Sequence, residues 1–179
     1  MLFLLYFSLI FLLALCFLFI AYQFYVNILQ PGAIYFPSTP VAIKQMLKLA
    51  PVSPKDTLVD LGSGDGRILI AAARRGAKAI GYEINPFLVW KSRRQIRQSQ
   101  LEKLAKVYWK SFWKADFHQA TIITIYLFPH LMNRLQRLLE KKVNHHLRVV
   151  TNDYPFPQLT PSKHHRQVYL YYFPNSNSH

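Results

Sequence analysis

The chain has 179 residues, with 22 Lys or Arg against 8 Asp or Glu, which gives a formal net charge of +14 at pH 7. Cys16 is the only cysteine, which excludes an internal disulfide and a cysteine-based metal site. Two pairs of adjacent histidines, His145-His146 and His164-His165, lie in polar segments. Because neighbouring side chains point in different directions, we expect solvated loop residues there and no metal site.

The N-terminal segment is apolar enough to cross a lipid bilayer. Its first thirty residues carry no charge, and from Met1 to Tyr22 only Ser8 interrupts the apolar run. A cleaved signal peptide would show a basic start, a shorter apolar core and a small-x-small site, and none is evident. Residues 1–30 are therefore predicted to be an uncleaved, single-pass transmembrane anchor. Because basic residues begin only at Lys44, the positive-inside rule places the rest on the cytoplasmic side, or on the matrix side of a mitochondrion.

After the anchor, residues 31–56 are predicted to be a proline-rich linker and a short helix over 41–50, with Thr39 as its N-cap and Pro40 at its first position. Residues 57–179 alternate strand and helix patterns, which is typical of a mostly parallel sheet with helices on both faces. We therefore predict a single α/β domain with a Rossmann-like sheet. The predicted strands are 57–61, 78–83, 105–109, 121–127, 147–152 and 167–173, and the predicted helices are 66–75, 86–103 and 129–142.

The connection to the last predicted strand is short. About fourteen residues follow the strand that ends at Asn152, which is too few for a crossover helix with its turns. We therefore expect an abbreviated sheet whose last strand is antiparallel and lies at an edge.

A glycine-rich run from Asp60 to Gly66 begins within the first strand of the domain and continues past its end, in the pattern D-x-G-x-G-x-G. Glycines allow the tight backbone conformations and close ligand approach of nucleotide-binding turns. A dinucleotide fingerprint would need another glycine at the position of Arg67, which disfavours a nicotinamide cofactor. Glu83 ends the next strand, so carboxylates stand at two neighbouring strand ends, which suits a ligand with a cationic amine and a ribose diol. The alternative is a purely structural strand-turn-helix unit.

The run resembles motif I of the class I methyltransferases that use S-adenosylmethionine (SAM), and Glu83 matches the acid that these enzymes place on the ribose hydroxyls. Further blocks resemble one family: the small membrane-anchored methyltransferases that include the lysine methyltransferases of the ATP synthase c-subunit and of the adenine nucleotide translocase. The resemblance covers roughly residues 31–165. Its blocks are YFPSTP from Tyr35, VDLGSGDGRILIAAA from Val59, GYEINPFLVWKSR from Gly81, TIYLFPHLMNRL from Thr124 and TNDYPFP from Thr151.

The resemblance implies SAM as the cofactor and a set of residues that bind it: Asp60, Gly62, Ser63, Gly64, Gly66, Glu83 and Ser111. Ser111 departs from the family, whose members usually carry an acid there to line the adenine pocket. Asp116, five residues further on, is expected to be a loop acid and not its replacement. Glu83→Ala is expected to weaken SAM binding while leaving the fold intact.

The acceptor side is predicted around the strand end Tyr126-Leu127-Phe128-Pro129, where this superfamily places substrate-facing residues. Tyr126, Phe128 and Pro129 are the candidates on one wall, and Asn152 or Asp153 on the other. Alternatively, Tyr126 and Phe128 are core residues of a buried strand. We assign no catalytic residue, because a sulfonium methyl is already activated and its transfer needs mainly in-line placement of a free lone pair.

The predicted helix 86–103 is strongly basic and suggests an anionic partner. A basic face next to an anchor favours anionic lipid headgroups, at roughly 1 kcal/mol per basic residue. Nucleic acid is the competing partner, since its phosphates attract the same face. Asp65 is expected to complement the dipole at the start of the preceding helix. The basic residues are Lys91, Arg93, Arg94, Arg97 and Lys103.

Three functions fit these features. The leading one is a membrane-anchored SAM-dependent methyltransferase that acts on a lysine of a membrane protein. The second is a methyltransferase for RNA, a lipid headgroup or a small amine; RNA would predict tight, salt-sensitive binding through the arginines of helix 86–103. The third is a non-catalytic membrane module that binds SAM or has lost it, which a SAM titration would separate from the other two.

Overall fold

The computed structural model describes residues 2–25 and 36–174, and the chain divides into two compact units, residues 1–35 and 36–179. The predicted anchor residues 26–30 and linker residues 31–35 lie outside the described residues. The first unit contains helix α1 (Leu2–Phe24). Its segment Phe3–Phe24, 22 residues with a mean hydropathy of 2.9, is long and apolar enough to cross a membrane. At ~1.5 Å per residue it matches the ~30 Å hydrocarbon core of a bilayer.

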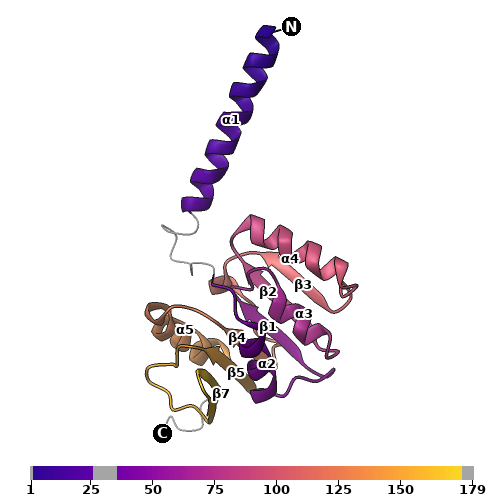
Figure 1. Cartoon of the computed structure of the whole chain (residues 1–179). Coiled ribbons are helices and arrows are strands. Elements are labelled where there is room, and N and C mark those ends of the chain that lie inside the picture. The colour runs from indigo at the N-terminus through magenta and orange to yellow at the C-terminus, as the bar shows by residue number, and fades with distance from the viewer. Residues whose placement is uncertain (1, 26–35, 175–179) are drawn as a thin grey trace. The chain divides into compact units, whose positions relative to one another are not determined.

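The second unit is built on a seven-stranded sheet in the order β3-β2-β1-β4-β5-β7-β6 (Figure 1). Strands β1 to β5 pair in parallel, and β7 runs antiparallel to both β5 and β6. The strand order reverses between β1 and β4, and ligands of α/β folds bind at the carboxyl ends of the strands beside such a reversal. The strands are β1 (Thr57–Leu61), β2 (Lys78–Glu83), β3 (Ala105–Trp109), β4 (Ile122–Ile125), β5 (Leu147–Asn152), β6 (Lys163–His165) and β7 (Val168–Phe173).

The last strand is antiparallel as predicted, but it does not lie at the edge of the sheet. Lys163–His165 form the short strand β6, which pairs with residues 168–170 of β7 and takes the edge position. Three polar residues show no alternation of apolar and polar side chains, so their pattern did not indicate a strand. His164-His165 therefore lie in a strand and not in a loop, although both are exposed. The described residues 153–162 contain no helix, in agreement with the short connection.

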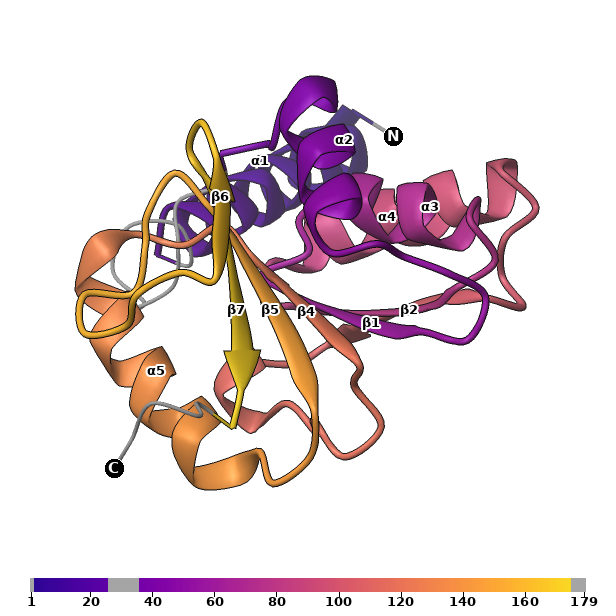
Figure 2. The ribbon, with the colours of Figure 1, turned by 90° about the horizontal axis from the view of Figure 1, so that it is seen from below.

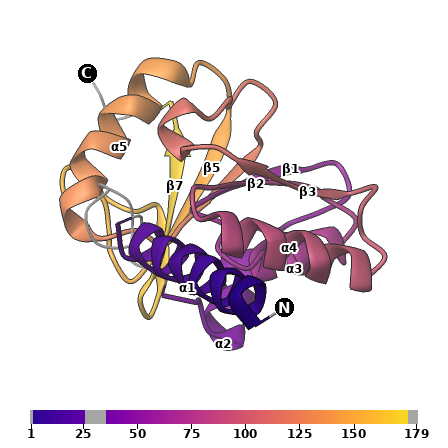
Figure 3. The ribbon, with the colours of Figure 1, turned by 90° about the horizontal axis from the view of Figure 1, so that it is seen from above.

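Helices cover the two faces of the sheet unequally (Figures 2 and 3). Three of them, α2 (Pro40–Leu49), α3 (Arg67–Ala73) and α4 (Pro86–Gln98), lie on one face, and α5 (Pro129–Lys142) lies on the other. The main core fills the three-helix side, where Met46, Leu58 and Leu69 from α2, β1 and α3 are fully buried. The connection from β3 to β4 contains one turn of 3-10 helix, η2 (Phe112–Lys114), in place of a full helix.

Helix α4 ends at Gln98, five residues before the predicted end at 103. Gln100 adopts a left-handed conformation with φ 58°, and the amide of Leu101 donates to the carbonyl five residues back, at 3.1 Å. This is the Schellman type of helix ending, which usually places a glycine where Gln100 stands. Because no glycine marks the position, the predicted helix ran too far, and Lys103 lies beyond its end.

The other predicted helices and strands begin and end within two residues of their observed bounds. Thr39 caps α2 as predicted: its Oγ1 accepts a hydrogen bond from the amide of Ala42 at 3.2 Å, and Pro40 is the first residue of the helix. β4 is shorter than predicted and ends at Ile125, so Tyr126 follows the strand and does not lie within it.

Candidate functional site

The turn between β1 and α3 depends on glycine at three positions. Gly62, Gly64 and Gly66 have φ of 81°, 54° and 82°, in the left-handed region that other residues rarely adopt. The amides of Gly62 and Ser63 donate to the carbonyl of Tyr82 at 3.0 and 3.1 Å, which fixes the turn against the end of β2. The hydroxyl of Ser63, a predicted cofactor ligand, instead packs over β2 and has no hydrogen-bond partner in the described part of the chain.

Gly66 also lets α3 approach α4 closely. A Cβ at Gly66 would lie 2.2 Å from the Oγ of Ser92, which is fully buried on α4. We expect Gly66→Ala to lower the free energy of unfolding by about 2–4 kcal/mol, from the left-handed strain and the overpacking together. Thermal unfolding of the full chain measures this loss. Adding Ser92→Ala should restore only part of it, because the strain at φ 82° stays; full stability of Gly66→Ala alone would contradict the close approach.

Glu83 holds the glycine turn through its side chain. One carboxylate oxygen accepts from the amide of Gly64 at 2.9 Å, and the other accepts from the amides of Ile84 and Asn85, both at 2.8 Å. Burial raises the pKa of the Glu83 carboxyl, and these three N–H groups oppose the rise. The sequence predicted that Glu83 binds the ribose hydroxyls of the cofactor. It carried no signal for the hydrogen bond from the amide of Gly64 to the Glu83 side chain.

Asp60 is a second buried carboxyl at the neighbouring strand end. It is 3% exposed, and its Oδ1 accepts a 2.7 Å hydrogen bond from the hydroxyl of Thr124, its register partner on β4. Burial, with a further contribution from the charge of Glu83, raises the pKa of Asp60 to about 7, although the Thr124 hydroxyl opposes the rise. Asp60 therefore titrates near neutral pH. Sequence reasoning missed Thr124, which only strand pairing brings beside Asp60.

Asp65 is tied into ion pairs between helices. Its carboxylate accepts two hydrogen bonds of 2.9 Å from Arg67 and lies 3.4 Å from the Nζ of Lys91 on α4. Arg67 also donates to the carbonyl of Ser38 at 2.9 Å, ahead of α2. The acid at the start of α3 thus links three segments around the turn, beyond the dipole role expected from its position.

Ser111 lies where the sequence placed it, just after β3. The amide of the preceding Lys110 donates to the carbonyl of Glu83 at 3.0 Å, so the end of β3 stands beside the end of β2. Ser111 is half-buried and makes no side-chain cap to η2. Asp116 is a loop acid, as expected: its Oδ1 accepts from the amide of His118, two residues on, at 3.0 Å.

The two predicted acceptor walls lie next to each other. Tyr126, Phe128 and Pro129 follow β4, while Asn152 and Asp153 stand at the end of β5, its parallel neighbour. Burial, together with the neighbouring Asp153 carboxylate, raises the pKa of Tyr126 to about 12, so its hydroxyl stays protonated at neutral pH. Asp153 adopts φ 65°, with its amide held by a 2.7 Å hydrogen bond to the backbone ahead of β7. Tyr126 and Phe128 are half-buried, and Asn152 is 5% exposed.

Phe36 joins the acceptor side from outside the predicted set. Its ring packs edge-on against Phe128, with centroids 6.2 Å apart and planes at 83°, and Phe128 stacks on His130 at 6.1 Å. Phe36 itself is 60% exposed. The block that contains it enters the prediction only through the family resemblance, and no spacing rule connects positions 36 and 128.

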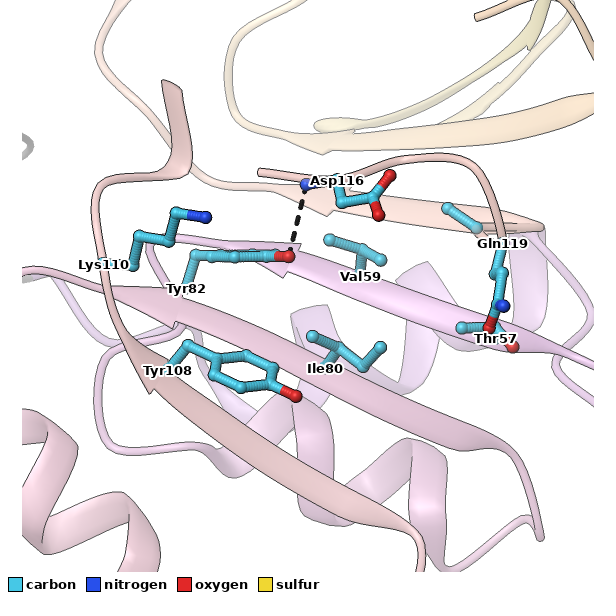
Figure 4. Close-up of a pocket in the computed structure, with 9 residues that line it drawn as sticks. Thr57, Val59, Ile80, Tyr82, Tyr108, Lys110, Asp116 and Gln119 are labelled. Carbon is cyan, nitrogen blue, oxygen red and sulfur yellow. Dashed lines mark hydrogen bonds between the residues drawn. The ribbon is translucent and has the colours of Figure 1, made fainter. Parts of the chain in front are cut away.

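A cavity of about 260 Å³ lies on the opposite face of the sheet from the two carboxylates (Figure 4). Val59 and Tyr82 line it, and side chains alternate along a strand, so Asp60 and Glu83 point the other way. The rings of Tyr82 and Tyr108 stack at 5.8 Å within it. This space lies under the connection from β3 to β4, where a full helix is replaced by η2, and it is separate from the glycine turn.

Titratable side chains in the described residues 2–25 and 36–174 form no cluster of three or more His, Cys, Asp or Glu able to hold a metal. His145-His146 lie in the loop before β5, where His145 Nε2 is 2.8 Å from the carbonyl of Ala120. His164 stacks against Tyr169 at 6.1 Å.

Comparison with known proteins identifies relatives over this region. The profile of the ANTKMT methyltransferase domain matches residues 60–163. The lysine N-methyltransferase of the ATP synthase c-subunit from Homo sapiens is 39% identical over 127 residues, which cover 71% of this chain and 54% of that protein. The chain thus spans about half the length of this relative. The protein-lysine N-methyltransferase of Saccharolobus islandicus is 31% identical over 135 residues, covering 74% of this chain and 84% of that protein.

A solved structure extends the likeness to three dimensions. The crystal structure of an RNA methyltransferase from Salinibacter ruber in complex with S-adenosyl-L-homocysteine superposes with a TM-score of 0.72 at 34% identity, covering 76% of this chain and 92% of that one. The fold is therefore that of the class I methyltransferases, as the strand order and glycine turn indicated. By the profile match over more than half of its length, the chain belongs to the family of the ANTKMT methyltransferase domain.

Proposed function

We propose that this protein is a SAM-dependent protein-lysine methyltransferase. The observation that carries the proposal is the pair of buried carboxyls, Asp60 and Glu83, at neighbouring strand ends beside the glycine turn. This pair of acceptors fits SAM, because carboxylate oxygens accept hydrogen bonds from ribose hydroxyls and from a cationic amine. Lysine as the acceptor is supported by the names of the human and Saccharolobus islandicus relatives.

Bound SAM would supply a methyl group on a positively charged sulfonium. The residues of the chain then have to hold the acceptor nitrogen in line and favour its unprotonated form, since a lysine amine titrates near ~10.4 in water. Asp153 offers a carboxylate that attracts the incoming ammonium. Tyr126 and the contacting rings of Phe128 and Phe36 would desolvate the amine and lower its pKa, and the Asp153 carboxylate could take up the proton that the ammonium releases.

We further propose that the acceptor lysine belongs to a membrane protein. The support is α1, which is apolar enough to anchor the chain, and the target in the name of the human relative, the c-subunit of ATP synthase. Since no basic residue precedes Lys44, the domain would lie on the cytoplasmic side, or on the matrix side of a mitochondrion.

The test is incubation of the full chain with methyl-labelled SAM and separate membrane-protein, soluble-protein and RNA fractions from cells that lack the gene. We expect label on a membrane protein. Tyr126→Phe and Asn152→Ala should each slow transfer about tenfold or more, equivalent to one lost hydrogen bond, with SAM affinity unchanged. Tyr172→Phe on β7 is the control, because Tyr172 pairs with Arg148, at the opposite end of β5 from Asn152. Unchanged transfer in both variants would refute the acceptor wall.

RNA methylation is the second candidate, favoured by the name of the Salinibacter ruber structure. Label in the RNA fraction would establish it in place of lysine methylation. Label in no fraction, together with no measurable SAM binding, would instead support a module without enzymatic activity. Ser111, which replaces the usual acid of the adenine pocket, would then be the first candidate cause.

A further inference from the structure

Three helices on one face of the sheet carry positive charge with no acidic residue among them. Residues 40–49, 67–75 and 86–98, which are α2, α3 with the two arginines after it, and α4, contain no Asp or Glu. We call the outward side of these three segments, which lie together in Figure 2, the basic helix layer. Their basic residues are Lys44, Lys48, Arg67, Arg74, Arg75, Lys91, Arg93, Arg94 and Arg97.

The layer is hollowed by two adjoining grooves. One has a volume of about 530 Å³ and is lined from all three helices, with Lys44, Arg67, Arg74 and Arg75 among its residues. The second, between α3 and α4, shares Arg67 and Arg74 with the first. The acid that borders the first groove, Asp65, is buried and already bonded to Arg67. The grooves therefore present basic side chains suited to phosphate groups.

Helix α4 adds exposed aromatic rings to this charged surface. Phe87 and Trp90 are 48% and 54% exposed, and their rings stack at 5.8 Å. The guanidinium of Arg94 lies 5.7 Å from the centre of the Trp90 ring. With Arg97, these residues are spaced three or four apart, which places them on one side of the helix. Aromatic rings beside arginines are typical of helices that lie at a membrane interface.

We propose that the basic helix layer docks on the surface of an anionic lipid bilayer, with Phe87 and Trp90 entering the headgroup region. The proposal rests on the membrane attachment in the proposed function. RNA phosphates would meet the same charges, but the chain itself favours the membrane. Only residues 25–39 separate α1 from α2, and fifteen residues extend to at most about 50 Å at ~3.5 Å each. An inserted α1 therefore keeps the start of α2 within about 50 Å of the bilayer.

Docking in this way would select acceptor lysines by their distance from the lipid headgroups. Helix α4 starts at Pro86, three residues after Glu83, so its aromatic end adjoins the carboxyl end of β2. Trp109, at the end of β3, is 62% exposed and donates from its indole nitrogen to the carbonyl of Ile84 at 2.9 Å. With this end of α4 in the headgroups, the site lies close to the membrane plane, and lysines next to the headgroups become the reachable ones.

The test places Trp90 in a bilayer and asks whether lipids quench it. The full chain carrying Trp109→Phe and Trp113→Phe has Trp90 as its only tryptophan. It is reconstituted into nanodiscs of brominated phosphatidylcholine, with or without phosphatidylglycerol. We expect quenching of Trp90 in the anionic discs, weakened by added salt. Arg74→Gln, Arg94→Gln and Arg97→Gln together should lower the ratio of docked to undocked protein roughly a hundredfold.

A charge-matched control removes three positive charges outside the layer, by Arg137→Gln, Lys141→Gln and Lys163→Gln, and should keep the quenching. Circular dichroism checks that both variants are folded. The proposal would be overturned if the triple arginine variant and the charge-matched control were quenched equally. It would also be overturned if the parent protein showed no quenching in anionic discs. A different result would assign the layer to RNA: no quenching in the discs, together with protection of Trp90 fluorescence by added RNA that depends on the same three arginines. A SAM titration on the same discs tests the proposed function separately, since docking does not require the cofactor.

Discussion

Replacing Glu83 with alanine is expected to lower the free energy of unfolding by about 3–5 kcal/mol and to abolish measurable SAM binding. The stability loss arises because three amides, of Gly64, Ile84 and Asn85, lose their acceptor in a site where Glu83 is only 8% exposed. The binding loss arises because the carboxylate that would accept from the ribose hydroxyls is removed and the amide of Gly64 loses its bond to β2. Thermal unfolding and calorimetric SAM titration of the same full-length sample measure both effects.

Glu83→Gln separates these two roles. The amide keeps one acceptor oxygen in place, so we expect a smaller stability loss of about 1–2 kcal/mol. It removes the negative charge that would face the ribose hydroxyls, so SAM affinity should still fall roughly a hundredfold. If Glu83→Gln binds SAM as tightly as the parent protein, the carboxylate serves the turn alone and the ribose assignment is wrong. The sequence alone led to the expectation that Glu83→Ala leaves the fold intact, and these three bonds add the expectation of a measurable loss of stability.

Asp60→Asn is expected to stabilise the protein at pH 8 while weakening SAM binding. The folded-state pKa of Asp60 is raised from 3.8 to about 7, so between these values the folded state holds a proton that the unfolded state has lost. Stability from this residue is therefore fully present below about pH 4 and is lost progressively as the pH rises from there to about 7. The full difference corresponds to roughly 4 kcal/mol at pH 8, which is an upper bound on the gain from the variant.

The measurement compares unfolding midpoints of Asp60→Asn and the parent protein from pH 4 to pH 8. The two should approach each other towards pH 4, differ increasingly between about pH 4 and pH 7, and keep a constant difference from there to pH 8, with the variant more stable. Curves that stay parallel would show that Asp60 does not titrate in this range. SAM affinity of the parent should rise over the same interval, because only the ionised carboxyl attracts the cationic amine, and the variant should lack this dependence.

The fold was predictable from sequence because strong local signals agreed with the tertiary structure. Thr39, the glycine run and the alternating apolar strands each specify their element locally, and parallel pairing follows from the helices between strands. The failures fall where local chemistry carries no signal. Gln100 ends α4 in a conformation usually given to glycine, and β6 is three polar residues that pair only because β7 is adjacent.

The candidate site was predictable residue by residue but not contact by contact. Asp60, Glu83 and the acceptor residues after β4 and β5 stand where strand ends should place them. The contacts of Thr124 with Asp60 and of Phe36 with Phe128 join residues 64 and 92 positions apart, and only the assembled sheet brings them together. Ser63 shows the opposite kind of error. Its position in the turn matches the motif, but its hydroxyl packs over β2 and does not point to the ligand side of the turn.

The short strand β6 also bears on the solubility of the chain. Strand β7, with the sequence VYLYYF, combines aromatic and β-branched residues with no charge, the composition that aggregates most readily when a sheet edge is bare. Lys163 and the two histidines of β6 pair with its first half, and Pro174 directly after β7 cannot donate to a further strand. Three polar residues thus cover the first half of a strand whose composition favours intermolecular β-structure.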